Sequence, residues 1–196
     1  GCENLKSVSI SNSVIRIRDN SFCNCYSLQS VTMPDYLFSI GKKAFYGCSS
    51  LKSIYIPYHI TYIGDYAFLG CKILKSINIP DTVTDIGESA FEECYSLNSV
   101  TISNSLSSIQ EYLFKNCSSL ESIIIPDSVT NIERFAFSGC KKLKSIKISK
   151  SVTEIGKYTF KNCEMVKSII MPDGLTYIGD NTFRHCKSLH SITMPK

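Results

Sequence analysis

The chain has 196 residues, a formal net charge of +4 and a hydrophobic fraction of 43%. That fraction is close to the globular norm and argues against disorder, while so mild a charge gives no reason to expect a nucleic-acid partner. No run of about 18 apolar residues is present, so no segment is predicted to insert into a membrane.

Cysteines recur through the whole chain at a fixed interval. The first is Cys2, the last is Cys186, and each follows the one before it by 23 residues. A fixed period in this range is typical of a solenoid, in which each repeat contacts mainly its neighbours. We therefore expect one elongated domain over residues 1–196 with about eight and a half repeats. Because the chain begins and ends inside a repeat, we expect it to be a fragment of a longer protein.

Each repeat continues from its cysteine into a short alternating segment. The third, sixth and eighth residues after the cysteine are apolar throughout, the fifth is always Ser, and the seventh is polar in most repeats. Alternation with a period of two is typical of a half-buried strand. The segment 99–102 is one example, and it is predicted to turn Val100 and Ile102 inward and Ser99 and Thr101 outward.

A turn and a second apolar pair come next. Pro80 and its equivalents predict the end of the strand, because Pro has no N–H to give to a sheet. Ser103 and two other Ser residues stand in the same place where Pro is missing. Val83 and Ile86 are an example of the apolar pair. In most repeats a Gly follows this pair, as Gly87 does here, and we expect it to allow a tight change of direction.

The repeat closes with an apolar pair that leads back to the cysteine, as at Ala90 and Phe91. The segment 89–91 is too short for an independent helix and is predicted to form a helical turn. Stacking would join Phe91 and its equivalents into a buried aromatic column. The expected fold class is mainly β with short helical turns, in which the tandem strands form one parallel sheet.

The segment from Leu74 to Cys94 shows the full pattern, Leu-x-x-Ile-x-Ile-Pro-x-x-Val-x-x-Ile-Gly-x-x-Ala-Phe-x-x-Cys. This pattern resembles the treponemal, BspA-like class of leucine-rich repeats over nearly the whole chain, with departures at Gln110, Glu133 and Val166. The resemblance implies a right-handed leucine-rich-repeat solenoid with the parallel sheet on its concave face. It also implies a secreted or cell-surface microbial protein that serves adhesion or host-protein binding.

The cysteines by themselves would also fit a disulfide framework or a metal site. Nine equivalent positions cannot pair without one left over, so we predict free thiols that are buried as small hydrophobes. Cys23 lies outside the column, and its equivalents, such as Glu92 and Lys115, are mostly polar. It is predicted to occupy a solvated position. The favoured interpretation is a silent surface residue, and the alternative is a thiol that reacts or crosslinks, for which Cys23 is the one candidate.

No cofactor, metal or catalytic site is predicted. His185, Cys186 and His190 are the nearest approach to a metal site, but no second ligand pair at structural-zinc spacing accompanies them. His59 lies in a predicted turn and indicates no function. The column of serines has no recurring His–Asp partner, and no glycine-rich phosphate loop occurs. We therefore do not expect an enzyme.

A binding surface is predicted on the outward side of the strands, because the curved sheet of a solenoid is its usual contact surface. The outward position two residues after the constant Ser is apolar at Ile124 and at Ile170. The alternative is a soluble face that tolerates single Ile residues and binds nothing. The candidate ligand-binding residues are Tyr55, Asn78, Ile124, Lys144, Lys147, Lys167 and Ile170.

Basic residues concentrate between positions 134 and 167, where nine Lys and Arg stand against two Glu. One interpretation is a solvated rim, since the repeat distributes these residues around each coil. The other is attraction of acidic glycans or acidic host proteins, which would weaken as salt rises.

The function predicted from these features is a non-catalytic adhesion module that binds host extracellular-matrix or cell-surface proteins. A spacer or display stalk with no ligand of its own is the alternative. The outermost repeats follow the interior pattern, and solenoids need capping repeats. We therefore expect the protein to continue beyond both ends, or to associate end to end.

Overall fold

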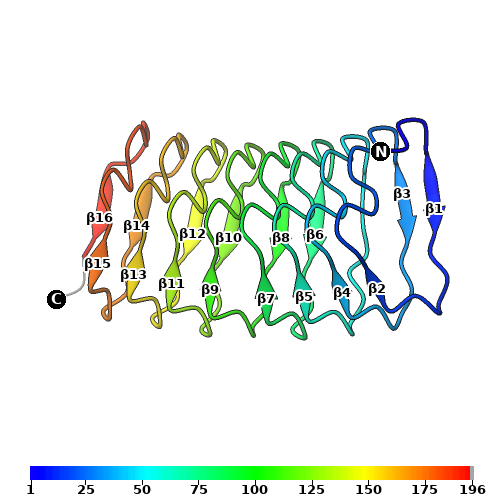
Figure 1. Cartoon of the computed structure of the whole chain (residues 1–196). Helices are drawn as coiled ribbons and strands as arrows, with labels where there is room; N and C mark the ends of the chain where they lie inside the picture. The colour runs from blue at the N-terminus through cyan, green and yellow to red at the C-terminus, as the bar shows by residue number, and fades with distance from the viewer. Residues whose placement is uncertain (195–196) are drawn as a thin grey trace.

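Each 23-residue repeat forms one coil of a β-solenoid, and the coils stack in a nearly straight row (Figure 1). The structure is a computed structural model, and it describes residues 1–194. Most coils carry strands on two of their sides, and the strands pair in parallel. Because each pair joins residues one repeat apart, as Val8 joins Val31, equivalent side chains of successive coils lie side by side.

The predicted alternating segments form strands of three residues, and the side of the solenoid that carries them is called the first face. The constant Ser and the variable residue point outward from it, and the central Val or Ile points inward. Its strands are β1 (Ser7–Ser9), β3 (Ser30–Thr32), β6 (Ser76–Asn78), β8 (Ser99–Thr101), β10 (Ser122–Ile124), β12 (Ser145–Lys147), β14 (Ser168–Ile170) and β16 (Ser191–Thr193).

A second row of strands, each of two residues, follows the second apolar pair, and this side is called the second face. These strands were not predicted from the sequence, because two residues are too few to show alternation. The strands are β2 (Arg16–Ile17), β4 (Ser39–Ile40), β5 (Tyr62–Ile63), β7 (Asp85–Ile86), β9 (Ser108–Ile109), β11 (Asn131–Ile132), β13 (Glu154–Ile155) and β15 (Tyr177–Ile178).

Neither row is one uninterrupted sheet, which corrects the expectation of a single sheet. The first face is divided into the pairs β1–β3, β6–β8, β10–β12 and β14–β16, and the coil at 51–57 contributes no strand. The second face is divided into two four-stranded sheets, β2–β4–β5–β7 and β9–β11–β13–β15. The strands stay close across these divisions, since the apolar side chains beneath them belong to one continuous core.

The predicted aromatic column runs through this core. Phe68 and Phe91 have ring centroids 5.3 Å apart and planes 2° from parallel, and the same stacking extends from Phe22 to Phe183. Phe91 is fully buried. Aromatic pairs at this separation lie within the favourable range for stacking, so the column is a confirmed feature of the fold.

The segment before each cysteine is a turn, and no helix forms within residues 1–194, which corrects the expected helical turn. The N–H groups of Phe91 and Glu93 donate to the next coil, to the carbonyls of Leu113 and Lys115 at 3.1 and 2.9 Å. Only the alternate amides, those of Glu92 and Cys94, bond within their own coil. A helical turn would need all of these donors, so contact with the next coil determines the conformation here.

The recurring glycine is explained by close approach between coils. A Cβ on Gly64 would lie 2.5 Å from the backbone nitrogen of Lys42 in the preceding coil, and Gly87, Gly156 and Gly179 are equally restricted. The second face is divided between β7 and β9, in the coil where Gln110 replaces this glycine. Glu133 also replaces it and keeps its backbone bond to Ile109 at 2.9 Å, a difference that nothing in the structure explains.

We predict that Phe91→Ala lowers the free energy of unfolding by about 3–5 kcal/mol, because it empties a fully buried aromatic site in a packed column. Urea unfolding followed by circular dichroism measures the change. Lys75→Ala, at an exposed position, is the control and should leave the stability nearly unchanged. Equal stabilities of the two variants would contradict the column.

We predict that Gly64→Ala destabilises the protein by about 1–3 kcal/mol, since the added methyl group overpacks the contact with the preceding coil. Gly174→Ala is a matched control, because a Cβ there has no neighbour nearer than 3.6 Å. Thermal unfolding of both variants tests the prediction. A loss of stability at Gly174 equal to that at Gly64 would show that steric contact is not the cause.

Candidate functional site

The variable outward residues of the first face form one row along the solenoid. Strand register aligns Asn78 with Thr101, Ile124 with Lys147, and Ile170 with Thr193. Because neighbouring strands lie about 4.8 Å apart, Ile124, Lys147 and Ile170 occupy three consecutive places. The structure therefore brings together the three residues at the centre of the predicted surface.

Ile124 and Ile170 project from this row into solvent, with exposed fractions of 65% and 71%. Both follow a buried Ile on the same strand, Ile123 and Ile169, and strand alternation turns them away from the core. Surface Ile residues are common singly. Two of them on either side of Lys147, in one row, form an apolar pair around a cation.

A groove of about 570 Å³ opens beside Ile170. It lies between β12 and β14, where the first face is divided and two strand edges face one another. Apolar side chains line it together with lysine and aspartate. Its lining residues include Lys144, Ile146, Lys147, Ile148, Lys150, Ile170, Met171 and Asp173.

A second hollow lies at the other division near this surface, between β8 and β10. It has a volume of about 290 Å³ and is lined by residues that include Thr101, Asn104 and Ile124. Each exposed Ile therefore stands at the rim of a depression, and the surface between them is uneven. Side chains of a partner could insert into these two depressions.

The lysines near the groove differ in how far their charge is already balanced. Lys144 Nζ lies 2.9 Å from Glu121 Oε2, and this contact lowers the pKa of the Glu121 carboxyl. Lys147, Lys150 and Lys167 make no ion pair within residues 1–194. The positive charge available to a ligand therefore comes from these three side chains.

Tyr55 and Asn78 lie outside this constellation. Tyr55 is exposed but belongs to the coil that forms no first-face strand, and Asn78 is separated from Ile124 by the place of Thr101. The predicted site is thus a compact group of Ile124, Lys147 and Ile170, with the two N-terminal members apart from it.

A second set of exposed side chains was not predicted from the sequence, and in it His59 lies against an aromatic ring. Tyr36 and His59 stack with centroids 5.0 Å apart, and Phe38 lies 6.2 Å from the same imidazole. The repeat period could have predicted this contact, since Tyr36 and His59 are 23 residues apart and therefore occupy equivalent places in neighbouring coils. His59 indicated no function because it was considered only as one residue of a turn.

The cysteine column is a ladder of free thiols. Each thiol from Cys48 onward donates a weak hydrogen bond to the carbonyl of a core Phe in the preceding coil, as Cys94 Sγ does to Phe68 O at 3.3 Å. Burial raises the pKa of the Cys48 thiol to about 12 and that of Cys94 further. The position requires a side chain that is small and apolar enough to be buried and that can also donate a hydrogen bond to this carbonyl. Cys meets both requirements.

All ten cysteines are free. Cys23 is half-buried, more enclosed than its polar equivalents suggested. Within residues 1–194 no group of three His, Cys, Asp or Glu side chains is placed to hold a metal ion. Over the same range no helix is long and apolar enough to cross a membrane.

Comparison with known proteins determines the family. The model of the BspA-type leucine-rich repeat region matches residues 1–121 and 107–196. The chain belongs to the BspA-type leucine-rich repeat family. The fold of this family is a protein-interaction scaffold. No curated protein shows significant similarity to the chain.

Solved structures of similar proteins share the solenoid. A leucine-rich repeat protein from Bacteroides ovatus is 27% identical with a TM-score of 0.79, over 100% of this chain and 68% of that one. The T. pallidum leucine-rich repeat protein is 28% identical with a TM-score of 0.76, over 82% and 77% of the two chains. The pneumococcal vaccine antigen PcpA, at 19% identity, a TM-score of 0.52 and coverage of 97% and 62%, shows likeness of fold alone.

We predict that an alkylating reagent at pH 8 labels Cys2 and Cys23 of the native BspA-type solenoid well before the seven thiols from Cys25 to Cys163. The latter are buried, and burial raises the pKa of those in the middle of the column, such as Cys117, so that little reactive thiolate is present. Mass spectrometry of the labelled peptides measures the order. Unfolding in urea should expose all ten, and early labelling of Cys117 in the native protein would contradict the ladder.

Proposed function

We propose that this BspA-type solenoid is a non-catalytic protein-binding module, and that it contacts its partner through the first face from Ile124 to Ile170. The observation that carries the proposal is the pair of exposed Ile residues around Lys147, next to a groove of about 570 Å³. Exposed apolar side chains gathered around a depression are typical of interaction surfaces.

The apolar pair would supply most of the binding energy. Full burial of one Ile side chain is worth about 1.5–3 kcal/mol, and both residues stand on strands that need not rearrange. Constant Ser residues and Thr101 surround them, so the small polar neighbours would form the rim of the contact and the Ile residues its centre.

The lysines without an ion pair would determine which charge is preferred on the partner's surface. Lys147, Lys150 and Lys167 favour an acidic partner surface, and their attraction should raise the association rate and fall with ionic strength. We infer a host extracellular-matrix or cell-surface protein as the partner and the microbial surface as the location, and kinship with the family supports both. An acidic glycan is the competing ligand, and the exposed Ile pair favours a protein.

A spacer without a ligand is the competing function. It requires only a soluble outer wall, and it leaves the positions of Ile124 and Ile170 without a role. End-to-end association of solenoids is a separate proposal, and light scattering of the isolated chain would test it.

We predict that the double variant Ile124→Ser and Ile170→Ser loses partner capture, with affinity weakened about a hundredfold or more, because two apolar contacts are removed. The assay is a pull-down with the chain against extracellular-matrix and epithelial proteins, at physiological and at high salt. Binding should decrease as salt rises.

Tyr55→Ser is the matched control, since Tyr55 is a large exposed side chain of the same outward row that lies away from the groove. It should retain capture, and all variants should keep their melting temperature. Undiminished capture by the double variant would refute this surface, and no capture by the parent chain would favour the spacer.

A further inference from the structure

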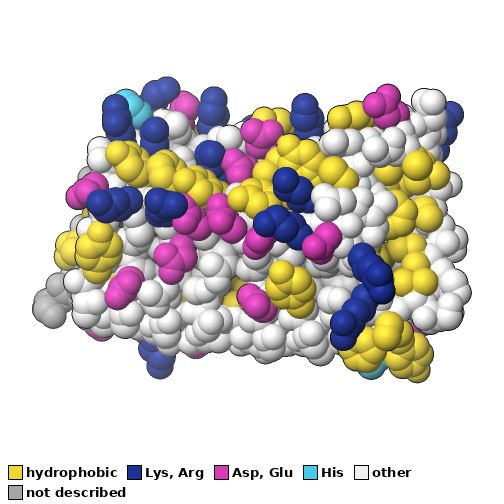
Figure 2. Space-filling view, viewed as in Figure 1, with side chains coloured by type: hydrophobic (Ala, Val, Ile, Leu, Met, Phe, Trp, Pro, Cys, Tyr) yellow, Lys and Arg dark blue, Asp and Glu magenta, His cyan; other side chains and the backbone are white. Residues whose placement is uncertain are grey.

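A cluster of large apolar side chains lies exposed on the coils near the N-terminus. Tyr36 and Tyr58 are 61% and 65% exposed, and Ile15, Phe38 and Tyr62 are also exposed. Figure 2 shows hydrophobic side chains and a histidine together in this part of the molecule, with Lys and Arg side chains next to them. We call Ile15, Tyr36, Phe38, Tyr58, His59 and Tyr62 the aromatic cluster.

The stacking of coils holds this cluster in place. Tyr36 and His59 occupy equivalent places in successive coils and stack at 5.0 Å with planes 22° apart. Phe38 lies at the end of the same turn, and its backbone N–H donates to Ile15 O at 2.9 Å. Rings that are already ordered lose little conformational freedom on binding, so they are suited to anchor a partner.

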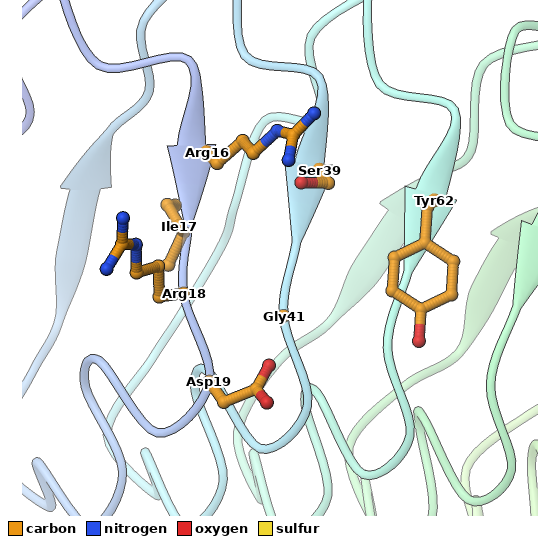
Figure 3. A pocket seen from close by; sticks show the side chains of 7 residues that line it. All are labelled: Arg16, Ile17, Arg18, Asp19, Ser39, Gly41 and Tyr62. Carbon is orange, nitrogen blue, oxygen red and sulfur yellow. The ribbon is translucent and has the colours of Figure 1, made fainter.

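A hollow of about 480 Å³ adjoins the cluster on the second face (Figure 3). It spans β2, β4 and β5, and Tyr62 belongs both to its lining and to the aromatic cluster. Arg16, Ser39 and Tyr62 occupy the same outward place in three successive coils. The hollow and the rings therefore form one continuous surface.

The charge of this surface comes from two arginines without a partner. Arg16 and Arg18 make no ion pair within residues 1–194. Three carboxylates also lie near the hollow. Asp19 is part of its lining and its Oδ1 accepts the backbone N–H of Lys42 at 2.8 Å, Asp65 Oδ2 lies 3.3 Å from Lys42 Nζ, and Asp85 aligns with Tyr62 on the next strand. None of them forms an ion pair with Arg16 or Arg18, so both guanidinium groups remain available to a ligand.

The geometry points to an extended acidic segment of a partner protein that also carries apolar side chains. Arg16 and Arg18 are two residues apart on one extended segment, a separation of about 6.6 Å. The two side chains extend to opposite sides of this segment (Figure 3), so an extended peptide that crosses the segment can offer one carboxylate to each arginine. The apolar side chains of the same peptide would contact the aromatic cluster.

This occupant fits better than a single phosphate or sulfate group. The two guanidinium groups point in different directions and do not converge on one point (Figure 3), whereas one anion is best held by donors that converge on it. Tyr and Arg together are also the residue types that dominate the binding energy of protein interfaces. The inference goes beyond the proposed function, because these coils and this face are distinct from the surface around Ile124 and Ile170.

The test uses the whole chain, immobilised, with a soluble copolymer of Glu and Tyr as the probe and surface plasmon resonance as the measurement. Poly-Glu and heparin of similar length are the comparison probes. The copolymer should bind more tightly than poly-Glu, because the tyrosines add contacts with the cluster, and heparin should bind most weakly. Tighter binding of heparin at Arg16 and Arg18 would overturn the proposal in favour of a glycan site.

Two variants separate the contributions. Arg16→Ala with Arg18→Ala should lower the copolymer affinity about tenfold or more, while Arg16→Lys with Arg18→Lys keeps the charge and should retain part of it. Tyr36→Ser with Tyr58→Ser should reduce the copolymer affinity to that of poly-Glu. An unchanged affinity of either the alanine or the serine variant would refute the surface.

Tyr177→Ser is the matched control, because Tyr177 is an exposed tyrosine that occupies the place of Tyr62 on the last strand of the second face, and this variant should bind the copolymer as the parent chain does. Weaker binding by this control, with the Arg16 and Arg18 variants unaffected, would place the acidic segment elsewhere on the second face and overturn this inference. Circular dichroism of every variant excludes unfolding as the cause, since all the altered side chains are exposed.

Discussion

The structure depends on one constraint, which is that a coil can bury its apolar side chains only against the next coil. Phe91 packs between Phe68 and Phe114, its N–H bonds to the following coil, and its carbonyl accepts the thiol of Cys117 at 3.2 Å. Aromatic stacking, backbone bonding and the thiol ladder therefore all act across the same junction. This is why the period is kept without a single insertion, since an extra residue would move all three out of register.

Because stacking fixes the inward places, variation is concentrated at the outward ones, and the proposed binding depends on these. On the first face three consecutive departures from Ser and Thr, which are Ile124, Lys147 and Ile170, lie at or next to the groove between β12 and β14. On the second face the departures include Arg16 and Tyr62, at the hollow that adjoins the aromatic cluster. A solenoid of coils with one common pattern thus presents two chemically different surfaces at two places along its length.

The first of these surfaces could be predicted, and the second could not. Strand alternation is a local rule, so an Ile at a polar place stands out from the sequence alone, as at Ile124 and Ile170. The aromatic cluster combines Ile15, Tyr36 and His59 from three coils, and no two of them are close in the chain. Their association follows from the stacking of turns between coils. From the sequence, these turns were predicted only as the places where strands end.

The sequence by itself determined the period, the inward residues and the free thiols, because a repeat of 23 residues with fixed apolar places admits only stacking of equivalent coils. Tertiary contact decided the rest. The turn at Phe91 is not helical because the next coil takes its amide protons, and Gly64 is required because the backbone of Lys42 lies so near. The second row of strands arises in the same way, from hydrogen bonds between coils that no single repeat contains.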